Sequence, residues 1–189
     1  IINLRKSLVL AHAKLDDMPA AIKACREMVD IKKKDLKEGS WQYFDLSWTV
    51  RHMEIMASLT AEQRDELFRA EQLAQEARDA LVRGDSATGE KRMLEILEIR
   101  KSIITVPHPL IFTALTDLGS FYLERGETEK ATERFREAVA LGEAHYNKEQ
   151  CPDGHIHLAT AYVFLGRSLA SQGDLSKGRD LLEQALEMR

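Results

Sequence analysis

The sequence predicts an all-α fold in which helix hairpins stack into a solenoid of about nine helices. Only 4 of the 189 residues are prolines, and the strong helix formers Ala, Leu, Glu, Lys and Arg are frequent. Apolar residues recur every three or four positions, which is the spacing of one helix face. Short turns centred on glycine separate successive helical stretches, so neighbouring helices are expected to lie back to back.

The expected helices can be placed by these turns and by two loops, at 105–109 and 151–154, that hold three of the four prolines. The predicted ranges are 2–15, 18–37, 41–58, 61–83, 86–103, 110–125, 128–147, 156–172 and 175–188. Because hairpins use helices in pairs, an odd number predicts that one helix between 41 and 83 is unpaired or serves two neighbours.

Residues 1–59 are expected to form divergent helical repeats. Within them, the 41–58 helix carries an aromatic and apolar face, formed by Trp41, Phe44, Trp48, His52, Ile55 and Leu59. We interpret this face as core, since burying such large rings stabilises a fold by several kcal/mol. A partner-binding surface is the alternative, because Trp and Tyr are enriched at binding hot spots.

The next helices begin with recognisable signals. Thr60 and Gln63 have the spacing of a capping box, which predicts a helix start near residue 61. The 110–125 helix has the clearest apolar stripe, made by Phe112, Leu115, Leu118, Gly119 and Tyr122. Gly126 is expected to end it, and Thr128 is expected to cap the helix that follows.

Three units share one internal spacing. The Leu118-Gly119 step, Gly126, Phe135 and Ala138 recur 47 residues later as Leu165-Gly166, Gly173, Leu182 and Ala185, and in part 42 residues earlier as Gly84, Met93 and Ile96. We expect the small residues Ala77, Gly119 and Gly166 to let the two helices of each hairpin approach closely. Met93, Phe135 and Leu182 should fill the seam between those helices.

Leu118-Gly119-x-x-Tyr122 followed by Ala131-x-x-x-Phe135 resembles the tetratricopeptide (TPR) repeat, and the likeness extends over residues 70–189. The unit of about 42 residues, with His108-Pro109 before its first helix, is similar to the long repeat of kinesin light chains and of many bacterial signalling proteins. The resemblance implies a right-handed superhelix. Its expected units are 60–106 with irregular phasing, 107–154, and 155–189 with a truncated end.

In the TPR family the second, fifth, ninth, twelfth and thirteenth positions of each unit line a groove on the concave face, which binds peptides or protein segments. The resemblance therefore implies partner-binding residues at Arg78, Thr113, Thr116, Ser120, Leu123, Glu124, Thr160, Val163, Arg167 and Ser171. Such mixed polar and apolar rows suit an extended segment, with the two arginines available to an acidic group. Thr116-Asp117 and Val163-Phe164 stand where kinesin light chains carry paired Asn, which argues against a kinesin-type cargo peptide.

The sequence predicts no enzyme, cofactor or metal site. It lacks the GxSxG, GxGxxG, GxxxxGK[ST] and HExxH motifs. A metal cluster would have to come from His145, Cys151, Asp153, His155 and His157. Because His155 follows His108 by the 47-residue repeat step, we interpret it as an ordinary loop position of the repeat.

The net charge and the cysteine content indicate which class of binding partner and which cellular compartment to expect. A net charge of −4 argues against nucleic acid as the partner, and no apolar run is long enough to span a membrane. Two cysteines 126 residues apart do not form a disulfide framework, so a reducing, cytoplasmic location is expected. The basic run at 32–34 is interpreted as a solvated helix end.

The function expected from these observations is a protein-interaction scaffold that binds a peptide or partner domain on its concave face. The alternative is a regulatory or sensor segment of a larger signalling enzyme, such as a bacterial Ser/Thr kinase or an ATPase-type transcription regulator. The chain starts at Ile1 and stops at Arg189 within a helical pattern, which suggests a piece of such a protein. Uncapped repeat ends would also favour homo-oligomers.

Overall fold

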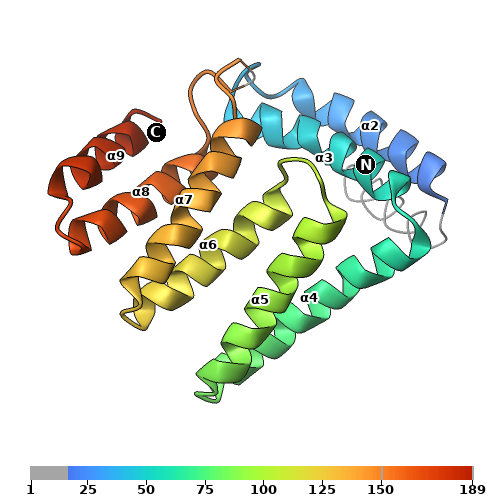
Figure 1. Cartoon of the computed structure of the whole chain (residues 1–189). Helices are drawn as coiled ribbons and strands as arrows, with labels where there is room; N and C mark the ends of the chain where they lie inside the picture. Colours follow the sequence, from blue (N-terminus) through green and yellow to red (C-terminus); the bar gives the residue numbers. More distant parts are fainter. Residues whose placement is uncertain (1–16, 150, 189) are drawn as a thin grey trace. The chain divides into compact units, whose positions relative to one another are not determined.

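The computed structural model of the protein describes residues 17–149 and 151–188, and every regular element in this part of the chain is an α-helix. The helices are α2 (Met18–Lys33), α3 (Trp41–Ser58), α4 (Ala61–Val82), α5 (Ser86–Ile103), α6 (Pro109–Glu124), α7 (Thr128–His145), α8 (Ile156–Ser171) and α9 (Leu175–Glu187) (Figure 1). The predicted all-α solenoid is confirmed. The helix expected at 2–15 lies outside the described residues.

The chain divides into two compact units. The first comprises Ile1–Arg64 and Glu149–Asp153, and the second comprises Asp65–Lys148 and Gly154–Arg189. Within the described residues, the α2–α3 hairpin belongs to the first unit, and α5 to α9, with most of α4, belong to the second.

The core of the first unit is the seam between α2 and α3. Three buried residues of α2 pack against three partly buried residues of α3, namely Cys25, Met28 and Val29 against Leu46, Val50 and Met53. The three α3 residues lie on the opposite side of the helix from the aromatic face that the sequence predicts to be core. Of that face, Phe44 is buried, whereas Trp41 and Trp48 are half-buried. The core prediction is confirmed in part, since Phe44 is buried, but the seam with α2 is formed by the other side of α3. Because α3 is apolar on both sides, periodicity could not identify the face that contacts α2.

The basic run lies at the end of α2, as expected for cations near a helix C-terminus. Lys33 Nζ lies 4.5 Å from the centre of the Tyr43 ring, and Lys37 forms a 3.1 Å ion pair with Asp153. The helix ends at Lys33, four residues before the predicted end. A turn at 34–36 and a second turn that contains Gly39, at a φ of 80°, lead into α3.

The capping box at the start of α4 is confirmed. The Thr60 backbone N–H donates to Gln63 Oε1 at 3.0 Å, and the Gln63 backbone N–H donates to Thr60 Oγ1 at 3.2 Å. The cap predicted for α7 is wrong, since Thr128 is the first residue of the helix and Glu127 occupies the capping position. The Glu127 carboxylate is instead engaged by Arg125 and Lys130, at 2.9 and 2.6 Å.

The second unit is built from the hairpins α4–α5, α6–α7 and α8–α9 (Figure 1). Gly84, Gly126 and Gly173 turn the three hairpins with φ values of 80°, 75° and 90°, which L side chains rarely adopt. The expected unpaired helix between 41 and 83 is not found, because α3 packs on α2 and α4 packs on α5. The irregular spacing there marks the junction between two hairpins.

Glycines set the close approach of helices in the second unit. A Cβ on Gly119 would lie 2.6 Å from Cε1 of Phe135, which is fully buried, so the predicted contact across the α6–α7 seam is confirmed. Gly166 and Gly178 approach each other so closely that a Cβ on either would lie 2.8 Å from the carbonyl oxygen of the other. Leu182 also contacts Gly166, as predicted.

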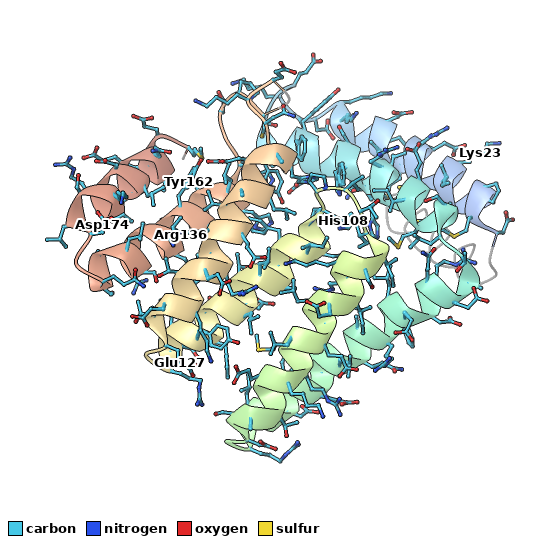
Figure 2. The ribbon with its side chains drawn as sticks, viewed as in Figure 1. Lys23, His108, Glu127, Arg136, Tyr162 and Asp174 are labelled. Carbon is cyan, nitrogen blue, oxygen red and sulfur yellow. The ribbon has the colours of Figure 1, made fainter. Side chains whose placement is uncertain are left out.

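Polar contacts join adjacent hairpins. The buried hydroxyls of Thr132 on α7 and Ser168 on α8 lie 2.6 Å apart, and Gln172 Nε2 donates to Thr132 Oγ1 at 3.0 Å. The hydroxyl of Tyr162 on α8, which is labelled in Figure 2, donates to Glu143 Oε1 of α7 at 2.6 Å. Burial and this acceptor raise the pKa of Tyr162, so the phenol keeps its proton.

Candidate functional site: a groove between α4 and α6

A groove of about 380 Å³ opens between α4 and α6 in the second unit, and α5 contributes to its lining. We call it the α4–α6 groove. Its lining residues are Glu71, Ala74, Ala77, Arg78 and Leu81 of α4, Met93, Ile96 and Arg100 of α5, and Thr113, Ala114 and Asp117 of α6.

The sequence builds this groove from small residues on two helices and larger apolar ones between them. Ala74 and Ala77 on α4 face the groove together with Ala114 on α6, and their short side chains leave the space open. Met93 and Ile96, one helical turn apart on α5, supply apolar surface. The groove therefore offers an apolar lining with a few polar groups, as small binding sites do.

Arg100 fixes the three helices around the groove. Its guanidinium is only 7% exposed, and Nη2 donates to Glu71 Oε1 of α4 at 2.6 Å. Nη1 donates to the backbone carbonyl of Leu110, at the start of α6, at 2.8 Å. Because both terminal nitrogens are used within the protein, Arg100 holds the groove in shape while it neutralises Glu71.

Asp117 and Arg78 supply the remaining charges. Desolvation against the surrounding protein raises the pKa of the Asp117 carboxyl, and the positive charges of Arg100 and Arg78 oppose this rise. Arg78 is exposed, and its Nη2 donates to Gln75 Oε1 on the same helix at 2.7 Å. With two arginines and two carboxylates, the groove lining has no strong net charge.

Four of the five hydroxyl side chains predicted to bind a partner already donate to their own helices. Each donates to the backbone carbonyl four residues earlier: Thr113 to Pro109, Thr116 to Phe112, Thr160 to Ile156 and Ser171 to Arg167, at 2.9, 3.1, 2.8 and 3.0 Å. Their oxygens keep lone pairs toward solvent, so they can accept hydrogen bonds from a ligand N–H. This role as acceptors could not be read from the sequence.

The structure brings together some of the predicted binding residues. Arg78 and Thr113 line the α4–α6 groove. The others lie on α6 and α8 without lining it: Ser120, Thr116, Leu123, Glu124, Thr160, Val163, Arg167 and Ser171. Sequence reasoning missed Arg100, whose partner Glu71 is 29 residues away, and gave no signal for it. Asp117 did have a signal, since it replaces an Asn of the kinesin light chain pattern.

His108 and His155 cap the starts of α6 and α8. His108 Nδ1 accepts the Leu110 backbone N–H at 3.0 Å at the start of α6 (Figure 2), and His155 Nδ1 accepts the His157 N–H at 3.1 Å at the start of α8. His155 also stacks on Tyr146, with ring centres 3.8 Å apart. The interpretation of His155 as the counterpart of His108 is confirmed. In residues 17–149 and 151–188, no group of three or more His, Cys, Asp or Glu residues could hold a metal.

A second depression, of about 520 Å³, lies on the first unit along the aromatic side of α3. It is lined by Glu38, Gly39, Tyr43, Phe44, Ser47, Trp48, Arg51 and Glu149. The aromatic partner surface considered from the sequence therefore has a counterpart in the structure. Its lining contains fewer of the predicted partner-binding residues than the α4–α6 groove, because the first unit has none of them.

Comparison with known proteins identifies the repeat. Residues 112–157 and 158–189 match the sequence model of the tetratricopeptide repeat. These two segments are similar to TPR repeats. The first runs from α6 into the start of α8 and the second covers the rest of α8 and α9, so the α4–α6 groove lies between the first matched segment and the hairpin that precedes it.

Solved structures share the TPR fold. One such structure contains the TPR-like repeats of a protein described as a kinesin light chain from Podosopora anserina. Its sequence is 15% identical to this chain, and the TM-score is 0.55, with 99% of this chain and 93% of that chain covered. BtubC (BKLC) from P. vanneervenii is 17% identical, with a TM-score of 0.59 over 100% of this chain and 79% of that chain. No curated protein matches the sequence.

The similarity to TPR repeats supports a protein-interaction scaffold, since TPR repeats typically bind protein partners. None of the described helices is both long and apolar enough to cross a lipid bilayer.

Proposed function

We propose that this TPR protein binds an extended peptide segment of a partner protein in the α4–α6 groove. The observation that carries the proposal is the groove itself, an opening of about 380 Å³ with an apolar lining and charged groups. It lies between the first helices of two successive hairpins, the surface that helical repeat arrays use for recognition.

The geometry suggests how a peptide would be held. An apolar side chain of the peptide would seat against Ala74, Ala77 and Ile96, where it displaces water from apolar surface. The Thr113 oxygen would accept a backbone N–H of the peptide, and the exposed Arg78 would donate to a carbonyl or carboxylate. Arg100 would keep the site preformed, which reduces the entropy lost on binding.

A longer segment would continue along the remaining predicted residues. Thr116 and Ser120 follow Thr113 on α6, and Arg167 lies on α8 of the next repeat. In this proposal these residues extend the contact, whereas the groove supplies the anchoring side-chain pocket. A few buried anchor residues commonly carry most of the binding energy of an interface.

The test is a selection of peptides from a displayed library of random sequences, with the full chain as bait. We expect the wild type to enrich peptides with an apolar anchor residue, and Ala74→Phe to lose them because the larger ring occupies the groove. An affinity loss of about 10-fold or more is expected for each selected peptide, since the anchor is displaced from apolar surface.

Ala87→Phe is the matched control, because it adds the same ring at an exposed position of α5 that does not line the groove. It should leave the affinity of the selected peptides unchanged. If no peptide is enriched, or if selected peptides bind Ala74→Phe as tightly as the wild type, the α4–α6 groove is not a peptide site.

A further inference from the structure

The last helix carries an exposed apolar stripe. Leu175, Leu182 and Leu186 of α9 are 68%, 38% and 72% exposed. They share one side of the helix, next to the side on which Gly178 and Ala185 are buried against α8. We call these three residues the α9 leucine stripe.

The repeat relates this side of α9 to an equivalent side of α7, which shows what such a side packs against. The 47-residue step relates the α9 leucine stripe to Thr128, Phe135 and Val139 of α7. On α7 that side faces the next hairpin, because the Phe135 ring stacks on Phe164 of α8 with centres 5.2 Å apart. Phe135 and Val139 are buried as a result. Leu182 and Leu186 of α9 therefore occupy positions whose counterparts on α7 are buried, and the counterpart of Leu182 packs against a further helix.

The charges beside the stripe indicate which helix fits. Arg179 and Glu183 flank the stripe on one side, one helical turn apart. Two copies of α9 laid antiparallel would place Arg179 of each beside Glu183 of the other. The same arrangement sets Leu175 of one copy near Leu186 of the other, so both the apolar stripe and these charges are self-complementary.

The existing contacts of Arg179 do not prevent this pairing. It lies 3.2 Å from Asp180 and 3.7 Å from Glu183 on its own helix, and all three side chains are more than half exposed. Such exposed ion pairs contribute little stability, so Arg179 can turn toward a carboxylate of a second copy.

We propose that a second copy of this chain docks on the α9 leucine stripe, forming a two-fold symmetric dimer through antiparallel pairing of the α9 helices. The surface is distinct from the α4–α6 groove, and the dimer does not depend on peptide binding.

Sedimentation velocity of the chain over a range of concentrations tests the proposal. The wild type should convert from 21.5 kDa monomer to dimer as concentration rises. Leu182→Glu combined with Leu186→Glu should weaken the dimer by about 100-fold or more, because two leucines are lost from each copy. Leu94→Glu is the matched control: Leu94 is 39% exposed on α5, and its replacement should leave dimerisation unchanged.

A charge reversal tests the antiparallel arrangement. Arg179→Glu alone should weaken the dimer, because it places like charges together, and adding Glu183→Arg should restore it. A chain that stays monomeric at every concentration overturns the proposal. So does a dimer that tolerates the two leucine substitutions. Ala74→Phe should leave the dimer intact, which separates this result from failure of the peptide site.

Discussion

At the scale of single residues, Gly119 and Gly89 are both crowded helical glycines, but replacing each with alanine should affect stability in opposite ways. A Cβ on Gly119 would lie within 3 Å of three atoms of the Phe135 ring, which is held between Gly119 and Phe164. A Cβ on Gly89 would clash with the end of Leu81, whose side chain is exposed and can rotate away. Gly119→Ala should therefore destabilise the fold by about 1–3 kcal/mol.

Gly89→Ala is the control for this prediction, because alanine is favoured over glycine within a helix by about 1 kcal/mol. It should leave stability unchanged or raise it. Urea unfolding followed by circular dichroism measures both variants. Equal unfolding midpoints for the two would show that the Phe135 ring does not constrain Gly119.

At the scale of elements, the start of α6 depends on an imidazole cap. His108 Nδ1 accepts the Leu110 N–H, and His108 is almost fully buried. His108→Ala removes the acceptor, whereas His108→Asn supplies a side-chain oxygen that caps helices well. The Asn variant should be more stable than the Ala variant by about 1 kcal/mol, since both lose the ring and only one loses the cap. Thermal unfolding of the two variants checks this, and equal stability would argue against the cap.

The helices themselves could largely be predicted from sequence. The ranges 41–58 and 86–103 match α3 and α5, because a serine or aspartate cap precedes each and a clear break follows. Gly126 ended α6 as expected, since a positive φ is compatible with glycine. The histidine caps were missed because histidine is not among the usual capping residues, although their 47-residue spacing showed that they are equivalent.

At the scale of the whole molecule, acid should weaken the fold. Hydrogen bonds from the Thr88 and Lys177 residues lower the pKa of the capping carboxylates Asp85 and Asp174. A lowered pKa means that the ionised form stabilises the folded state above the unfolded value of about 4, and that this stability is lost as pH falls through the folded value. The thermal midpoint should therefore decrease at low pH.

Asp85→Asn combined with Asp174→Asn should flatten this acid dependence, because asparagine caps a helix without titrating. Asp65→Asn, which changes an exposed carboxylate that caps no helix, is the control and should keep the wild-type profile. Asp117 acts in the opposite sense, since its raised pKa makes protonation favourable to the fold. Thermal scans at several pH values measure these effects, and an unchanged profile in the double variant would contradict the assignment.

The α4–α6 groove shows the limit of sequence reasoning at this scale. Arg78 and Thr113 could be predicted because they occupy positions defined within a single repeat. Arg100 and Met93 come from α5, the second helix of the preceding hairpin, and they reach the groove only through the packing of three helices. A pattern within one repeat does not contain that information.

The buried hydroxyl pair between α7 and α8 bears on how this chain folds. Repeats with similar apolar faces can associate in the wrong order, because hydrophobic contacts are non-directional. Thr132 and Ser168, with Gln172, satisfy one another only when these two helices meet in the native alignment. A shifted or exchanged pairing would take the Ser168 and Gln172 donors away from Thr132, whose own hydroxyl donates to Thr128 within α7. Each buried donor left without an acceptor costs about 1–3 kcal/mol. This polar contact therefore favours the native pairing of α7 with α8 over pairing with a helix of another repeat while the array folds.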